Sequence, residues 1–231
     1  MARLRRNHVS KIVIALVVCT GSAMIGFVLG NAKVMTGKAS TPLLSRQSDE
    51  KEIDRYERPG EPFEFGNLNV KRTKVDLRQK FSAKSLAQSG GGQPEDWLEN
   101  LEFSLKNKLG KQITFILVQL QFPETEVNGP KMVYNLHMGI PVAASESEQK
   151  SASPLALEPG NKVVFTLSSE ELKLLRQFLA IRHFELANLN KMVIRVVSVI
   201  FDDGMKWEMD YYFKPNPSLP SRYERVSNGS V

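Results

Sequence analysis

Three histidines are the side chains best suited to acid–base or metal chemistry in this chain of 231 residues. His8 lies near the start, His137 lies past the middle, and His183 follows a helix-like segment. The sequence holds no H-E-x-x-H, G-x-S-x-G, P-loop or Rossmann glycine pattern. Histidine becomes an acid, a base or a metal ligand where partners converge on it, and no motif indicates such partners. The sequence therefore predicts no catalytic residue, no metal site and no cofactor.

Four carboxylates gather near the end of the chain, at Asp202, Asp203, Glu208 and Asp210. A calcium site needs about six to eight oxygen ligands, and a retaining glycosidase needs two carboxyls about 5–5.5 Å apart in a cleft. Glu208 and Asp210 would lie roughly 7 Å apart on one face of one strand. Turn chemistry accounts for Asp203, and outward-facing charge accounts for Glu208 and Asp210. We therefore predict neither kind of site here.

The same region predicts a β-hairpin. Two strand-like runs, Met192–Phe201 and Met205–Phe213, flank Asp202-Asp203-Gly204. Asp-Gly favours a two-residue type I′ turn, which would place Ile200 opposite Trp207 on the core side. The opposite face would carry an apolar row mixed with charges. An apolar face of this kind often marks a contact site, so four of its residues form a candidate partner surface: Val197, Val199, Phe201 and Tyr212. Two alternatives are that a loop or the helix covers this face, or that the register slips by one residue.

Aromatic and basic residues outside this surface are assigned to structure. Trp207 and Tyr211 alternate on a strand and are expected to be buried, whereas Tyr212 is the better candidate for binding. The run Lys71-Arg72-Thr73-Lys74 is short. It is typical of a solvated edge strand that uses charge against unwanted pairing. We predict no nucleic-acid partner.

The N-terminus determines where the chain is expected to act. Residues 12–30 form an uncharged apolar run that follows Arg3, Arg5, Arg6 and Lys11. Its length lies between the roughly 7–15 residues of a signal-peptide core and the roughly 20 of a membrane span. Gly30-Asn31-Ala32 offers a cleavage site, whereas the retained positive charges favour an anchor with its N-terminus in the cytoplasm. A buried soluble helix is the remaining alternative. The residues expected in the membrane include Ile12, Ile14, Leu16, Ile25, Phe27 and Leu29.

An anchor would make the chain a single-pass inner-membrane protein with its C-terminal domain outside the cytoplasm. A cleaved leader would make it periplasmic or secreted. Cys19 is the only cysteine and lies inside the apolar run, so the exported part has no disulfide. The formal net charge is +6, and removing the four charges before the run leaves +2 for residues 31–231. The basic character is therefore partly a targeting signal.

The remaining chain divides into three parts. Residues 31–66 are rich in small and charged residues without a sustained apolar period, which predicts a flexible tether. Residues 67–215 predict one domain, since about 150 residues is an ordinary domain size. Residues 216–231 predict a loose tail. The strands expected inside the domain are 101–106, 113–122, 132–140, 162–167 and the two arms of the hairpin. Ser168 and Glu171 form a capping box before a helix over 169–183.

Short strands, one helix and Pro/Gly turns favour a mainly β fold, an antiparallel two-layer sandwich. Four motifs at their spacing resemble a family of uncharacterised exported bacterial proteins, of the acidobacterial type, with an immunoglobulin-like β-sandwich. They are Trp97–Leu101 leading into Leu105–Ile113, then Phe122-Pro123-Glu124, Leu157–Gly160 and Phe201–Gly204. The resemblance covers about residues 67–217. It implies fold and location, and it assigns no functional residue.

The leading functional hypothesis is a non-enzymatic binding or scaffolding module of the cell envelope, held at the membrane by the N-terminal helix. Its partner would be an envelope protein or a second copy of the chain. The alternative is an enzyme or a ligand-binding accessory with its site in loops 78–96 and 141–156. A concave pocket with converging polar groups would favour the alternative.

Overall fold

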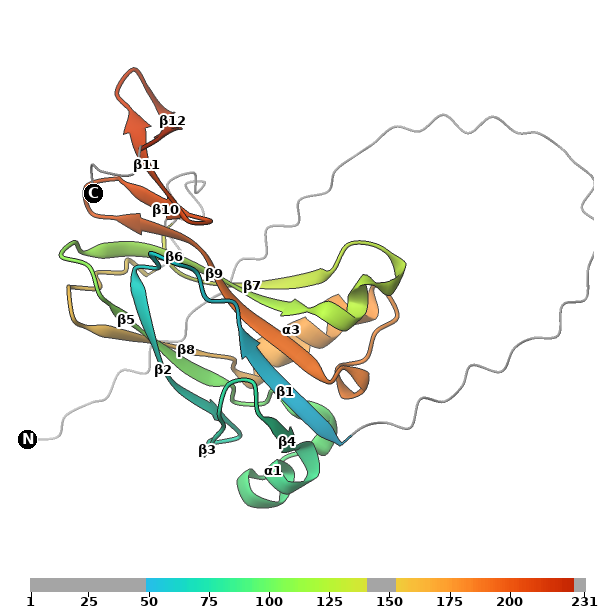
Figure 1. Ribbon diagram of the computed structural model, residues 1–231. Helices are drawn as coiled ribbons and strands as arrows, with labels where there is room; N and C mark the ends of the chain where they lie inside the picture. Colours follow the sequence, from blue (N-terminus) through green and yellow to red (C-terminus); the bar gives the residue numbers. More distant parts are fainter. Residues whose placement is uncertain (1–48, 141–152, 227–231) are drawn as a thin grey trace, which may run out of the picture.

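The structure is a computed structural model that describes residues 49–140 and 153–226. Its fold is mainly β, with strands in two sheets (Figure 1). The larger sheet has eight strands: β1 (Glu50–Arg55), β4 (Lys80–Ser82), β6 (Ile113–Phe122), β7 (Met132–Gly139), β9 (Lys191–Phe201), β10 (Lys206–Glu208), β11 (Tyr211–Asn216) and β12 (Leu219–Arg225). The smaller sheet has four strands: β2 (Phe63–Val70), β3 (Thr73–Lys74), β5 (Glu102–Asn107) and β8 (Lys162–Thr166).

Helical segments lie between the strands. They are α1 (Ala83–Gly90), α3 (Ser169–Ala180) and three short 3₁₀ segments, η1 (Pro94–Asp96), η2 (Pro123–Asn128) and η3 (Leu186–Asn188). The predicted capping box is confirmed: the Ser168 hydroxyl accepts from the Glu171 N–H, and the Glu171 carboxylate accepts from the Ser168 N–H. The helix buries Leu172, Leu175 and Leu179. The region predicted as a loop over 78–96 instead contains β4, α1 and η1.

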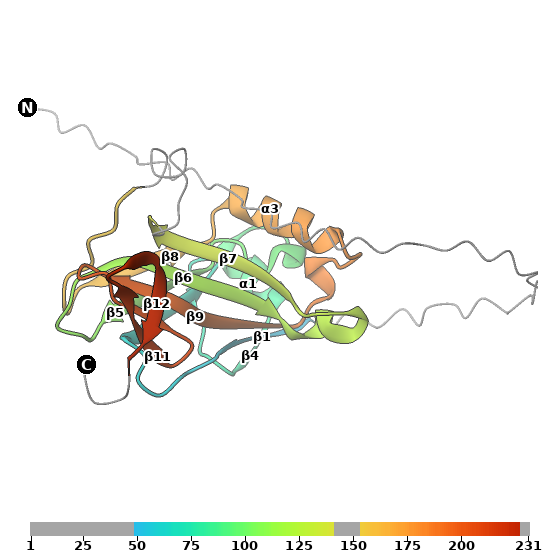
Figure 2. The same ribbon diagram turned by 90° about the horizontal axis from the view of Figure 1, so that it is seen from above.

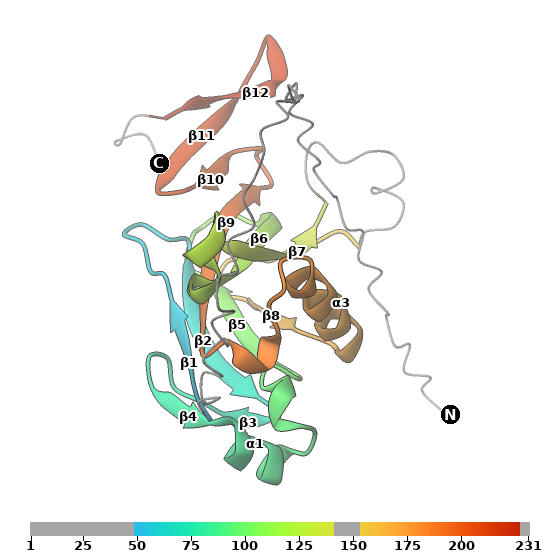
Figure 3. The ribbon, with the colours of Figure 1, turned by 90° about the vertical axis from the view of Figure 1, so that its right-hand side faces the viewer.

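Strand β9 organises the larger sheet. It pairs along its length with β6, which pairs in turn with β7. On the other side, its first half pairs with β1 and its second half with β10. The β1–β9 pair is parallel, so the larger sheet is mixed, and the prediction of a wholly antiparallel fold is wrong at this pair. Beyond β10, the β11–β12 hairpin projects from the body at the end opposite α1 (Figures 1 and 3).

One hydrophobic core joins the two sheets. It includes Phe103 and Phe165 of the smaller sheet, whose rings stack with centroids 5.2 Å apart, and Ile116 and Val118 of β6. Both tryptophans, Trp97 and Trp207, are fully buried in it. Helix α3 lies beside β7 and β8 when the molecule is viewed from above (Figure 2). The core therefore extends under α3 as well as between the sheets.

Two predicted boundaries need correction. The tether predicted over 31–66 contains β1 and the start of β2, and Ile53 of β1 is fully buried. The loose tail predicted over 216–231 contains β12, which pairs with β11. Residues 31–48 of the predicted tether, residues 227–231 of the predicted tail, and the apolar run 12–30 lie outside the described residues. No helix among residues 49–140 and 153–226 is long and apolar enough to cross a membrane.

Candidate functional site

The candidate partner surface is buried within the chain. The exposed fractions of Val197, Val199 and Phe201 are 5%, 0% and 2%, and Tyr212 is half-buried with its ring stacked on Phe201. The cause is a β-bulge in β9: Leu117 faces Ser198, whereas Val118 faces Val196. A bulge adds one residue to one strand, so the side chains that follow it change faces. The prediction of an exposed partner surface at these residues is wrong.

The hairpin register also differs from the prediction by one residue. Val199 faces Trp207, because the loop has three residues: the Phe201 N–H donates to the Met205 carbonyl, and the Gly204 N–H donates to the Phe201 carbonyl. Gly204 adopts a positive φ of 78°, as expected for a type I turn closed by a left-handed residue. The chain then turns again at Met209 and Asp210, so the run predicted as one strand forms β10 and β11.

The residues first considered for chemistry lie apart. His137 is exposed on β7, and His183 is exposed after α3, while His8 is outside the described residues. Asp203 pairs with Lys111 at 2.9 Å and Glu208 with Lys206 at 2.8 Å. Asp210 pairs with Arg58. No group of three or more His, Cys, Asp or Glu side chains suited to a metal ion occurs among the described residues.

A pocket of about 470 Å³ provides the candidate site. It opens between η1 on one side and the end of α3 with η3 on the other, and we call it the η1–α3 pocket. Its polar rim is formed by side chains of η1 and α3 and by Glu185, which directly precedes η3, and its apolar floor includes the buried Leu186. The lining residues are Gln93, Glu95, Asp96, Arg176, Ala180, Phe184, Glu185, Leu186 and Ala187. Part of the predicted alternative site, namely Gln93, Glu95 and Asp96, therefore lines a pocket.

The buried Lys71 side chain fixes the backbone next to the η1 wall. Only 1% of this lysine is exposed, and its Nζ donates to the carbonyls of Gln93 at 2.8 Å and Gly91 at 3.2 Å, with Glu99 at 3.5 Å. A buried ammonium is tolerated where polar groups surround it. A side chain at Gly92 would place its Cβ against the Glu99 Oε2 and 2.8 Å from the Lys71 Nζ. Lys71 and the glycine loop thus fix the backbone at the pocket rim.

Lys51 and Trp97 hold the η3 wall. The Lys51 Nζ donates to the carbonyls of Ala187 at 2.8 Å and Leu189 at 3.0 Å, and to the Asn190 side chain at 3.0 Å. The Trp97 indole N–H donates to the carbonyl of Leu186 at 3.0 Å. Lys51 is 2% exposed, and burial lowers the pKa of its ammonium despite the attraction of Glu124 and Asp49. Two lining residues, Leu186 and Ala187, are therefore held in place through their backbones.

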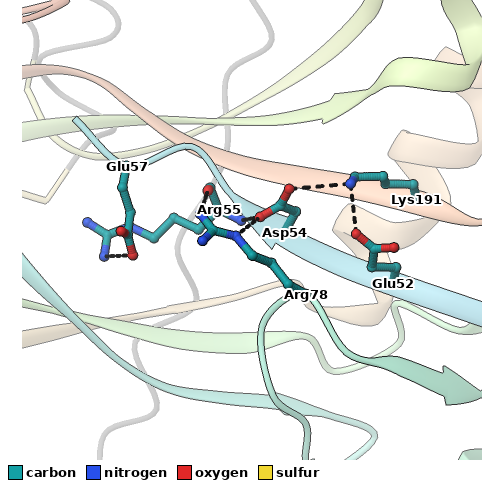
Figure 4. Close-up of polar contacts among 6 residues, drawn as sticks. All are labelled: Glu52, Asp54, Arg55, Glu57, Arg78 and Lys191. Carbon is teal, nitrogen blue, oxygen red and sulfur yellow. Dashed lines mark hydrogen bonds and ion pairs between the residues drawn. The ribbon is translucent and has the colours of Figure 1, made fainter.

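A charged network fastens the strand that carries Lys51. On the outer face of β1, Lys191 contacts Glu52 at 2.7 Å and Asp54 at 3.3 Å, and Arg78 donates to Asp54 at 2.7 Å (Figure 4). Burial alone would raise the pKa of Asp54, but the hydrogen bonds from Arg78 and Lys191 outweigh it and lower the pKa. Lys51 lies on the opposite, inner face of the same strand. The network thus stabilises the strand on which the η3 wall depends.

The rim of the pocket carries net negative charge. Glu95, Asp96 and Glu185 contribute three carboxylates, and Arg176 contributes the one guanidinium. Arg176 of α3 pairs with Asp96 of η1, which ties the two walls together. Glu185 accepts from Asn188 at 3.2 Å, while Glu95 is exposed. The pocket therefore combines an apolar floor with carboxylates able to attract a cation.

Sequence reasoning missed the residues that build this pocket. Lys71 was interpreted as edge-strand charge and Lys51 as part of a tether. Comparison of the chain with protein-family models, with curated proteins and with solved structures returns no match.

Proposed function

We propose that this chain is an extracytoplasmic binding module of the bacterial cell envelope that captures an organic cation in the η1–α3 pocket. The pocket is the observation that supports this most directly, because concave sites with an apolar floor and a few placed polar groups are the usual form of ligand sites. Both walls are pre-organised by buried lysines, which reduces the ordering cost of binding.

The charge of the rim selects the ligand class. A protonated amine next to a short apolar group would place its charge near Glu95 and Glu185 and its hydrocarbon on Phe184 and Leu186. A lysine side chain of an envelope protein has this chemistry, as does a free alkylamine. The proposal thereby joins the binding module and the ligand-binding accessory that the sequence left open.

The enzymatic alternative has less support. The Arg176 guanidinium and the Asp96 carboxylate at the pocket already pair with each other. No histidine, cysteine, serine or threonine is among the lining residues, so a nucleophile with its base is not assembled there. Binding is therefore the function that this geometry supports best.

The location of the module is part of the proposal. Its support is the charged start and apolar run of residues 1–30, which favour a single-pass inner-membrane anchor or a cleaved leader. The fold we propose is an immunoglobulin-like sandwich, supported by two sheets on a shared core. Alkaline phosphatase fused to the C-terminus should be active whether the leader stays as an anchor or is cleaved. The mass of the mature N-terminus distinguishes the anchored chain from the cleaved one.

Titration with n-hexylamine, hexanol and hexanoate, followed by backbone amide NMR shifts, tests the ligand class. We expect hexylamine to shift amides of η1, η3 and the end of α3, with hexanoate having no effect. Ala180→Trp should block the pocket, whereas Gln177→Trp, an exposed change on the same helix outside the lining, should not. Equal binding of all three probes, or binding unaffected by Ala180→Trp, would contradict the proposal.

A further inference from the structure

The β11–β12 hairpin presents the larger sheet's outermost edge. Strand β12 ends the strand order beyond β11, and no strand among the described residues pairs with its other side. The hairpin projects past the smaller sheet (Figures 1 and 3), so its edge is approachable by another molecule. An open strand edge is a template for a further strand.

The backbone groups available on this edge can be identified. The Val226 N–H donates to the Tyr212 carbonyl at 2.8 Å, so Val226 faces β11. The backbone N–H and C=O groups alternate in direction along an antiparallel strand. Those of Glu224 therefore also point toward β11, while those of Tyr223 and Arg225 point outward. An added strand would pair with these outward groups.

The charges on β12 fit a second copy of the same strand. Two copies running antiparallel about Tyr223 would place Arg222 opposite Glu224 of the other copy, and this pair would occur twice by symmetry. A shift in which Tyr223 pairs with Arg225 would bring the two Glu224 side chains together. A shift in the other direction would bring the two Arg222 side chains together. Opposite charges across strands stabilise a pairing and like charges destabilise it.

We propose that the chain forms a symmetric dimer through antiparallel pairing of β12 with β12 of a second copy, centred on Tyr223. Arg222 and Glu224 are both exposed, and Glu224 is held on its face by a 2.6 Å hydrogen bond from Asn216. The pairing joins the two larger sheets into one continuous sheet. It leaves the η1–α3 pocket of each copy outside the contact, so its test is independent of ligand binding.

Analytical ultracentrifugation of the full chain in detergent micelles tests the dimer. Glu224→Arg and Arg222→Glu each replace both attractive pairs by repulsive ones. We expect either change to weaken dimerisation at least about tenfold. An equimolar mixture of the two variants restores the attraction in both pairs, so it should form a mixed dimer. Glu126→Arg makes the same charge change on η2 and should leave dimerisation unchanged.

A cross-link covers the case in which charge variants fail to fold. Tyr223→Cys in a Cys19→Ala background has one thiol per chain, and directly opposed residues lie about 4.5–5.5 Å apart at Cα, within disulfide range. Rapid oxidation to a covalent dimer, absent for Ser85→Cys on α1, supports the proposal. A monomeric wild-type chain, or a dimer insensitive to both charge variants, would overturn it.

Discussion

The two tryptophans offer a matched test of how the core and the pocket wall are held. Trp97 and Trp207 are both fully buried, but the indole N–H of Trp97 donates to the Leu186 carbonyl, whereas that of Trp207 has no partner among the described residues. Replacing either by phenylalanine removes the same atoms and the same N–H. The two substitutions should therefore differ mainly in the hydrogen bond.

The magnitude follows from that difference. Trp97→Phe loses one net hydrogen bond, worth about 0.5–1.5 kcal/mol, because the Leu186 carbonyl keeps a second donor in the Leu189 N–H. Trp207→Phe removes a buried N–H that has no hydrogen-bond partner, and the desolvation cost that this group imposes on the folded state, about 1–3 kcal/mol, is then removed. Trp97→Phe should therefore lower the free energy of unfolding by about 1.5–4.5 kcal/mol more than Trp207→Phe does. The same atoms are lost from two fully buried sites, so the cost of exposing or burying them cancels between the two variants.

Urea unfolding followed by far-UV circular dichroism measures this difference without relying on tryptophan fluorescence. The slopes of the transitions should match the wild type, so that midpoint shifts report stability. Backbone amide NMR adds a local readout, because only Trp97→Phe should perturb η3. If Trp207→Phe were as destabilising as Trp97→Phe, the assignment of the hydrogen bond as the distinguishing interaction would be wrong.

Two further predictions concern the glycine loop and the charged network. Gly92→Ala should lower the free energy of unfolding by about 1–3 kcal/mol, because Gly92 has φ +82° and its Cβ would meet the Glu99 carboxylate and the Lys71 Nζ. Gly91→Ala, at φ +81° with open space around the added Cβ, should lower it by less in urea unfolding. The pKa of Asp54 is lowered from its ordinary value of 3.8, so its stabilising effect is complete above that pH and is lost as pH falls through the folded-state pKa. Asp54→Asn should lower stability at pH 6 and flatten its decline below pH 4, and an unchanged acid profile would rule out this role.

Regular apolar alternation made part of the fold predictable. The range predicted for β6, 113–122, is the observed one, and β7, β8 and the start of α3 lie within one or two residues of their predicted bounds. The capping box at Ser168 and Glu171 was predictable because both partners are local and their side chains make the contacts. Where the period broke, prediction failed: the bulge at Val197 puts Val196 and Val199 on the same face.

Strand β1 shows why a buried strand can be missed. Its inward residues are Lys51, Ile53 and Arg55, so its only apolar inward residue is Ile53. Arg55 is buried through its ion pair with Glu61 and its position 5.0 Å from the centre of the Phe65 ring. A composition of charges predicts a solvated segment unless partners elsewhere satisfy them. Neither residue type nor spacing in the sequence marks Glu61 and Phe65 as those partners.

The pocket could not be predicted for a related reason. Lys71 and Lys51 hold its walls by donating to backbone carbonyls, at Gln93 and at Ala187. Every residue has such a carbonyl, so the acceptor's amino-acid type carries no signal, and only the donor's burial reveals the interaction. Lys71→Met would retain the packing of the stem yet leave the Gln93 and Gly91 carbonyls without this donor. The positions that shape this site are therefore recognisable through burial of a charged side chain, which only the folded structure shows.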